Sequence, residues 1–304
     1  MCTSLSLPTP DGTRLFGRTL DLDTHFGEAV TFTPRRFPFT FGNCSPLTCH
    51  YALLGMATSV DGYPLYADAM NEKGLCMAGL RFAESAVYAE FSREDRLALA
   101  PWELIPYLLC TCATVEEVRA ALGEICVVDK PFSDTVGTAP LHWHISDPLG
   151  EGLILEVTAE GMGLYPDKLG VLTNEPPYPA QMAAAEACLL SCGDEAGLPG
   201  GFSSPDRFLR TATLRRRWLD RGRIDATETE TKSYAVAQFF SILGAVSPTV
   251  GSVMTPEGGC HRTLYTCCMD TAAGVYHYRT EGDVETRQVK LEECDRCGIK
   301  LLRF

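Results

Sequence analysis

The sequence predicts an α+β fold in which antiparallel sheets are covered by helices. Apolar runs of strand length come in pairs separated by short turn sequences, which is typical of β-hairpins. Segments with helical apolar spacing also come in pairs, and antiparallel sheets commonly bury a face against such a layer. The 304 residues are 45% hydrophobic and contain no repeat or low-complexity tract, so we expect one domain over residues 1–304.

The first predicted element is a β-hairpin. Residues 2–7 and 15–22 have strand character, and the segment 8–12 between them is rich in Pro, Asp and Gly. Further strands are expected at 51–56, 63–70, 75–82, 141–145, 153–157 and as a pair within 265–278.

Helical spacing marks residues 102–112, 207–221 and 234–243. Thr114 and Glu117 form a capping-box pattern that begins another helix, which runs through Leu122. The chain from Val284 onward is mostly polar.

Charge and hydropathy exclude several classes of protein. The net charge of −13 argues against nucleic-acid binding, and the three arginines at 215–217 are interpreted as a solvated helix face. No apolar stretch of about 18 residues is present, so we expect no membrane span. The N-terminus lacks the features of a signal peptide, and we predict a cytoplasmic protein whose fourteen cysteines stay reduced.

Cys2 is the first candidate for chemistry. If Met1 is removed, Cys2 becomes the N-terminal residue, and its α-amine, with an ordinary pKa of about 7.7–8.0, lies beside its own thiol. One residue can then supply both nucleophile and base. Arg18 and Asp21 lie on the partner strand of the same hairpin. A cation favours the thiolate, and a carboxylate can orient the ammonium.

Two observations qualify this interpretation of the hairpin. A cysteine at the second position, taken alone, is more often without a special role, and Arg18 and Asp21 could be an ordinary surface pair. Residues 18 and 21 also point to opposite faces of a regular strand. Either a bulge intervenes, or Asp21 lies past the end of the strand.

The chain resembles the choloylglycine hydrolases, the family of bile salt hydrolases and penicillin V acylases. The resemblance covers almost the whole chain and is carried by ordered motifs at residues 1–3, 16–21, 63–80, 141–143, 171–176 and 197–208. It implies a four-layered αββα N-terminal-nucleophile fold, with two antiparallel sheets between helical layers. It also implies that Met1 is removed and that a linear amide is hydrolysed through a thioester, without a metal or organic cofactor.

The resemblance implies a role for each matching residue. Cys2 is the nucleophile, Arg18 supports its thiolate, and Asp21 holds its amine. Asn174 donates its side-chain amide to the oxyanion, and Arg207 is a second arginine near the nucleophile. Without the resemblance, Asn174 would be interpreted as part of a turn and Arg207 as an ordinary residue at a helix start.

Arg81 departs from the family pattern, because bile salt hydrolases have Asn here and penicillin acylases have Tyr. The backbone N–H at this position serves the oxyanion in the family. The Arg81 side chain could therefore meet an anionic substrate tail or point to solvent. Leu20 and Val60 are assigned with Arg81 to the substrate pocket.

The similarity over residues 63–79 favours conjugated bile salts as substrates, with release of glycine or taurine. Penicillin V or an N-acyl-homoserine lactone is the alternative. The resemblance also implies a homo-oligomer. The stretch between Asn174 and Arg207 is shorter than in familiar members, in which it serves tetramer assembly, so a tetramer is not implied.

Two other functions remain open. A cysteine-rich metal-binding or redox protein would use pairs such as Cys294 with Cys297 and Cys188 with Cys192, whose spacing suits zinc. The adjacent Cys267 and Cys268 would lie one on each face of a strand. The second alternative is an inactive protein of the same fold that keeps Met1. The strand residues His142 and His144 are expected in the core or in a cleft wall.

Overall fold

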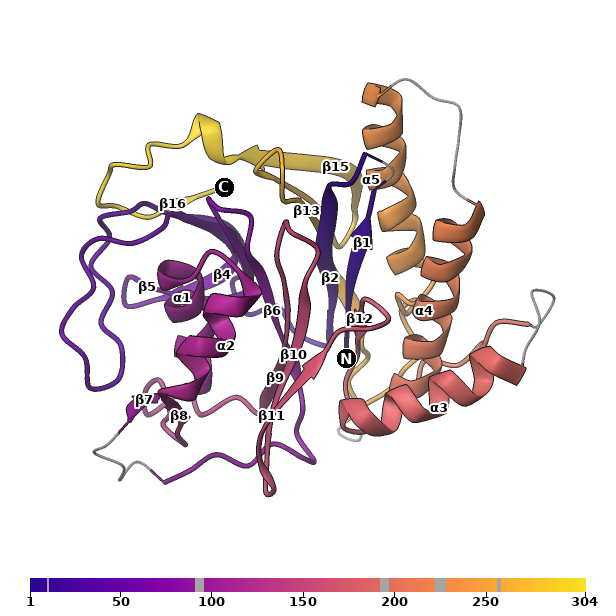
Figure 1. Cartoon of the computed structure of the whole chain (residues 1–304), viewed down its shortest axis with the longest axis horizontal. Helices are drawn as coiled ribbons and strands as arrows, with labels where there is room; N and C mark the ends of the chain where they lie inside the picture. Colours follow the sequence, from indigo (N-terminus) through magenta and orange to yellow (C-terminus); the bar gives the residue numbers. More distant parts are fainter. Residues whose placement is uncertain (10, 91–95, 192–196, 222–227, 256–257) are drawn as a thin grey trace.

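The computed structural model describes the chain except for residues 10, 91–95, 192–196, 222–227 and 256–257. Two antiparallel sheets lie face to face between two helical layers, as Figure 1 shows. This arrangement confirms the predicted αββα architecture.

The first sheet has the strand order β12 (Val171–Leu172), β1 (Cys2–Pro8), β2 (Arg14–Leu22), β13 (Arg262–Asp270), β14 (Val275–Thr280) and β15 (Asp283–Lys290). The second has the order β11 (Gly161–Pro166), β10 (Gly152–Thr158), β9 (Leu141–Ser146), β6 (Cys76–Arg81), β5 (Tyr63–Asn71), β4 (Leu53–Val60), β3 (Ala29–Thr33) and β16 (Leu302–Arg303). Strands β7 (Leu97–Leu99) and β8 (Ile125–Val127) form a small parallel pair.

Helices cover the outer face of each sheet. The second sheet is covered by α1 (Pro101–Thr111) and α2 (Val115–Gly123), and the first by α3 (Tyr178–Ser191), α4 (Ser204–Arg221) and α5 (Glu228–Gly244). A 3₁₀ turn, η1 (Leu291–Glu293), follows β15.

The central strands of the second sheet bury side chains on both faces because both faces are covered. Along β6, Cys76, Ala78 and Leu80 face the first sheet, whereas Met77 packs in the core beneath α1 and α2. This alternation follows from the two-residue period of a strand. It places the end of β6 at the interface of the two sheets.

Several local predictions need correction. The mostly polar tail after Val284 contains strands β15 and β16, and the sequence did not predict β3, β7, β8, β11, β12 or α3. Glu117 receives no hydrogen bond from the N-cap N–H and instead accepts from Ala113 N (2.6 Å), although Thr114 caps α2 as predicted. Arg215 is not simply solvated, because its Nε donates to Ser6 O (2.7 Å).

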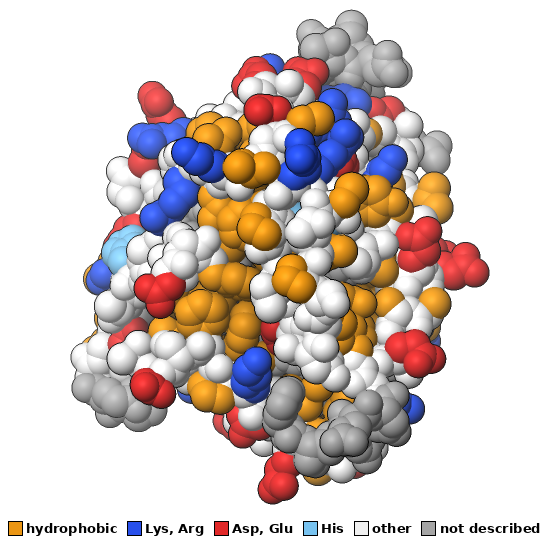
Figure 2. All heavy atoms as spheres, turned by 90° about the vertical axis from the view of Figure 1, so that its left-hand side faces the viewer, with side chains coloured by type: hydrophobic (Ala, Val, Ile, Leu, Met, Phe, Trp, Pro, Cys, Tyr) orange, Lys and Arg blue, Asp and Glu red, His pale blue; other side chains and the backbone are white. Residues whose placement is uncertain are grey.

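The face that bears α1 and α2 carries charges of both signs around its rim, and Figure 2 shows no continuous basic surface across it. Among the helices that the structure describes, none is long and apolar enough to cross a membrane.

Candidate active site

The β1–β2 hairpin places Cys2 at the interface of the two sheets. Cys2 pairs with Leu20, and Ser4 pairs with Arg18. Residues directly opposite in an antiparallel pair share a face, and residues two apart on one strand do as well. Cys2, Leu20 and Arg18 therefore all face the second sheet, and Cys2 is only 5% exposed.

Arg18 is a buried cation on the same face as Cys2. Its Nη1 donates to Gly79 O (2.5 Å) and Ala67 O (3.2 Å) of the second sheet, and its Nε donates to Thr19 O (3.1 Å). Its Nη2 has no hydrogen-bond partner in the part of the chain that the structure describes. Burial lowers the pKa of Arg18, but attraction to its acidic neighbours, foremost Cys2, outweighs burial and raises it. The Arg18 guanidinium thus places a permanent positive charge on the face of the hairpin that carries the Cys2 side chain.

Asp21 lies on the other face of β2, and it is fully buried. It accepts from Thr19 Oγ1 (3.1 Å) and from Thr263 Oγ1 (2.7 Å). Asp21 is inside β2, so it does not lie past the end of the strand. A register shift does occur beside it, but in β13, between Thr263 and Tyr265. The side chains of Arg18 and Asp21 thus lie on opposite faces of β2, and each has its own partners.

Asn174 and Arg207 fix the main chain of Cys2. The Cys2 N–H donates to Asn174 Oδ1 (2.9 Å), and Arg207 Nη2 donates to the same oxygen (2.7 Å). Arg207 Nη1 also donates to Cys2 O and to Thr3 Oγ1 (2.8 Å). Burial lowers the pKa of Arg207, and the charges of Asp21 and Cys2 act in the opposite direction.

The amide of Asn174 is oriented by these contacts. Because Oδ1 accepts two hydrogen bonds, Nδ2 points the other way and donates to Arg81 O (2.8 Å). Phe82 N–H donates to Pro140 O on the β9 side of β6 (2.8 Å). Successive N–H groups of a strand point to opposite edges, so the N–H of Arg81 points away from β9. Two donors, the Arg81 N–H and Asn174 Nδ2, therefore lie together on the edge of β6 that faces away from β9.

Met1 occupies the space next to these groups. Its amine donates to Asp21 O (2.5 Å), and Asp21 N donates to Met1 O (2.9 Å), so Met1 extends the hairpin by one pair. Burial lowers the pKa of the Met1 amine; Cys2 and Asp21 raise it, and Arg207 and Arg18 lower it further. A low pKa leaves an amine neutral and able to accept a proton.

A cavity of about 550 Å³ opens beside Met1, and its size is typical of small-molecule sites. The side chains of Arg81, Asn174 and Arg207 line it, and Arg81 is exposed. The other two residues assigned to the pocket lie elsewhere. Leu20 is buried in the core, and Val60 lies at the end of β4; neither borders this cavity.

Several supporting residues were not predicted from the sequence. Thr19 and Thr263 hold Asp21, Thr3 accepts from Arg207, and Ser204 Oγ accepts from Asn174 N (2.8 Å). Glu175 accepts from Ser85 Oγ (2.7 Å). Isolated Ser and Thr residues carry no sequence signal for such roles, because their partners are distant in the chain.

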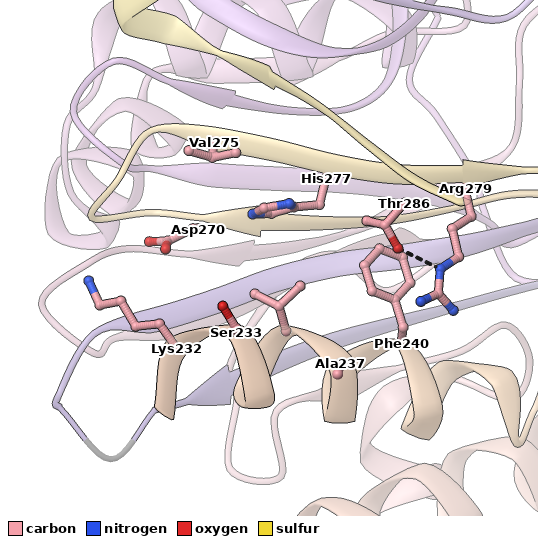
Figure 3. Close-up of a pocket in the computed structure, with 10 residues that line it drawn as sticks. Lys232, Ser233, Ala237, Phe240, Asp270, Val275, His277, Arg279 and Thr286 are labelled. Atoms are coloured by element: carbon pink, nitrogen blue, oxygen red, sulfur yellow. Dashed lines mark hydrogen bonds between the residues drawn. The ribbon is translucent and has the colours of Figure 1, made fainter. Parts of the chain in front are cut away.

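A second pocket, shown in Figure 3, lies between α5 and strands β14 and β15. The Nε–H of Arg279 donates a hydrogen bond to Thr286 Oγ1 (2.9 Å), and Arg279 Cζ lies 4.3 Å from the ring centroid of Phe240. Lys232 forms an ion pair with Asp11 (3.4 Å). None of the residues that line this pocket borders the Met1 cavity, so it is separate from the candidate active site.

The metal-binding alternative finds no support in the described residues, among which no group of three His, Cys, Asp or Glu could hold a metal ion. Cys188 belongs to no such group, Cys294 and Cys297 carry free thiols, and Cys192 lies outside the described residues. Cys267 and Cys268 are both fully buried, as are His142 and His144, which confirms that the two histidines lie in the core.

Comparison with known proteins identifies the family of the chain. Residues 2–296 match the linear amide C–N hydrolases of the choloylglycine hydrolase family. A bile salt hydrolase/transferase from Lactiplantibacillus plantarum is 35% identical, over 96% of this chain and 92% of that protein.

Two solved structures are also similar. A mutant conjugated bile acid hydrolase from Clostridium perfringens has a TM-score of 0.90 at 32% identity, over 100% of this chain and 96% of that one. A penicillin V acylase from Agrobacterium tumefaciens has a TM-score of 0.81 at 21% identity, over 99% of this chain and 90% of that one. It therefore shares the fold.

The fold and the buried cysteine at position 2 define a hydrolase of the N-terminal-nucleophile class. The chain belongs to the choloylglycine hydrolase family, whose members hydrolyse linear amides.

Proposed function

We propose that the protein loses Met1 and then hydrolyses the amide bond of conjugated bile salts, with Cys2 as nucleophile and Arg18, Asp21, Asn174 and Arg207 as its site. The observation that carries this proposal is the position of the Cys2 backbone nitrogen. It is held by Asn174 Oδ1 (2.9 Å), in surroundings whose burial lowers the pKa of the neighbouring amine. Once Met1 is absent, this nitrogen becomes a free α-amine beside its own thiol, where it can act as the base.

The first half of the reaction forms a thioester. The Cys2 amine takes the proton of its own thiol, and the thiolate, beside Arg18, attacks the amide carbon. The carbonyl electron pair moves to oxygen, where the Arg81 N–H and Asn174 Nδ2 can donate to it. When the C–N bond breaks, the leaving nitrogen takes a proton from the Cys2 ammonium and departs as glycine or taurine.

The second half releases the bile acid. The Cys2 amine, neutral again, takes a proton from water as the water oxygen attacks the thioester carbon. The same two donors can stabilise the second oxyanion. The C–S bond then breaks, the thiolate regains its proton from the ammonium, and the acid leaves.

Relatives support the bile salt assignment. The proteins that cover nearly the whole chain at 32–35% identity are named for bile salts or conjugated bile acids, whereas the penicillin V acylase at 21% identity supports only the fold. Arg81 lines the cavity and offers a cation to a carboxylate or sulfonate tail. Penicillin V or an N-acyl-homoserine lactone remains the alternative substrate.

A substrate panel tests the proposal. Glycine- and taurine-conjugated bile salts, penicillin V and an N-acyl-homoserine lactone are incubated with protein whose mass lacks Met1, and free amine is measured. We expect turnover of the conjugated bile salts and nearly none by the Cys2→Ser variant, because an alkoxide forms far less readily than a thiolate. If penicillin V alone is turned over, the assignment of conjugated bile salts as substrates is wrong. If the Cys2→Ser variant is fully active, the assignment of Cys2 as nucleophile is wrong.

We also propose that the protein is one domain that acts in the cytoplasm. Apart from Cys188, the twelve cysteines that the structure describes carry free thiols, which suits a reducing compartment. The homo-oligomer that the resemblance implies stays a prediction, which light scattering on the purified protein would test.

A further inference from the structure

His142 on β9 lies behind the two donors assigned to the oxyanion. Its side chain is fully buried, and its ring stacks on Phe82 with a centroid distance of 4.2 Å and an interplanar angle of 8°. Its Nε2 lies 2.8 Å from Thr173 O. Phe82 directly follows Arg81, and Thr173 directly precedes Asn174. One ring thus contacts both chain segments that supply the donors.

The protons on this ring follow from its partners. Thr173 O is a carbonyl oxygen and can only accept, so Nε2 carries a hydrogen. Nδ1 lies 3.0 Å from Glu156 Oε1, and the Glu156 carboxyl also accepts from Tyr178 N at the start of α3 (2.9 and 3.1 Å). A buried hydrogen bond therefore joins His142 to Glu156, and this pair ties the Thr173 segment to the first turn of α3.

This support differs from the direct contact between the two segments. Asn174 Nδ2 donates to Arg81 O (2.8 Å), and the Glu175 carboxylate accepts from Glu84 N (2.9 Å), Ser85 N (3.1 Å) and Ser85 Oγ (2.7 Å). These direct contacts lie on the cavity side of the two segments, since Arg81, Glu84, Asn174 and Glu175 all line the cavity. The stacked ring and its two buried hydrogen bonds fix their separation from behind, where no substrate enters.

The neighbouring histidine on the same strand face provides a contrast. His144 contacts Ser4 Oγ (2.9 Å) and Asp167 Oδ2 (3.0 Å), so it supports β1, which carries Cys2. His142 contacts the oxyanion segments instead.

We propose that His142, together with Glu156, is a positioning residue that holds the Arg81 N–H and Asn174 Nδ2 at the separation an oxyanion needs. This inference rests on the proposed function. It predicts a defect confined to steps that develop negative charge on the carbonyl oxygen, with the reactivity of the Cys2 thiolate preserved.

The test compares two reactions of the same cysteine. Hydrolysis of a conjugated bile salt needs the oxyanion donors, whereas alkylation of Cys2 by iodoacetamide is a direct displacement that does not. His142→Asn keeps an amide donor near the position of Nδ1 and loses the one that faces Thr173. We expect its kcat to fall about ten- to a hundred-fold, less than for a lost oxyanion donor because the donors are misplaced and not removed, with the Cys2 alkylation rate within about two-fold of wild type.

Two further variants keep the test decisive. His142→Gln places an amide donor near the position of Nε2, so it should retain more turnover than His142→Asn, and it provides the measurement if the Asn variant does not fold. His50→Asn is the matched control. His50 is also buried, with ring nitrogens at Tyr51 O (2.7 Å) and Phe37 O (2.9 Å), but it lies away from the site. It should leave the ratio of turnover to alkylation unchanged.

The outcomes separate the two proposals. Wild-type protein that alkylates at Cys2 but hydrolyses no conjugated bile salt would overturn the proposed function. Active wild type with an equally active His142→Asn variant would overturn the positioning role alone. A parallel loss of turnover and alkylation in both His142 variants would also overturn it, because His142 would then serve only the fold.

Discussion

The two sides of the active site are built in different ways. The nucleophile side, Cys2, Arg18 and Asp21, comes from one hairpin, and these residues are 5%, 1% and 0% exposed. The oxyanion side, Arg81 and Asn174, comes from the end of β6 and from the segment after β12, about the rim of a cavity. The nucleophile is thus set by local strand pairing, whereas the oxyanion donors depend on the packing of segments distant in the chain.

The largest effect should come from the nucleophile side. An alanine inserted between Met1 and Cys2 converts the Cys2 amine into an amide, which cannot accept a proton. We expect a folded protein without measurable turnover, checked by intact mass, circular dichroism and amine release. Wild-type protein whose mass lacks Met1 is the control. Full turnover by a preparation that retains a residue before Cys2 would show that the α-amine is not the base.

A smaller effect is expected on the oxyanion side. Asn174→Ala removes one donor and also the acceptor of the Cys2 N–H, and loss of one oxyanion donor typically lowers kcat about 10²–10³-fold. Ser85→Ala is the matched control, because it removes a hydrogen bond to the next residue, Glu175. Steady-state kinetics on a conjugated bile salt compares the two. Equal, small losses in both variants would remove Asn174 from the oxyanion site.

The sequence predicted the nucleophile side better than the oxyanion side, for a physical reason. Hairpin register follows from strand alternation and a turn, so Cys2 and Arg18 could be placed together from local pattern. Asn174 and Arg207 were found only through the family resemblance, since nothing in a Thr-Asn-Glu-Pro turn specifies a partner in β1. Thr263 was missed altogether, because its contact with Asp21 depends on a register shift in β13.

The smallest effect concerns Arg81, whose side chain is exposed where it lines the cavity. An exposed ion pair contributes little, so Arg81→Asn should lower kcat/KM for anionic conjugates by up to about five-fold. Neutral amides of the same bile acid should be nearly unaffected, because the backbone N–H remains. Assays on a matched charged and neutral pair measure the difference. Equal effects on both would place the Arg81 side chain outside substrate recognition.

The pairing of Met1 with Asp21 has a consequence for when the enzyme matures. An aminopeptidase must bind a free, extended N-terminus. In the folded protein, however, the Met1 amine and the Met1 carbonyl are both hydrogen-bonded to the main chain of Asp21. If Met1 is removed as proposed, its removal must take place after the N-terminus leaves the ribosome and before β1 pairs with β2. When synthesis and folding are faster than the peptidase, folded molecules would keep Met1 and remain inactive.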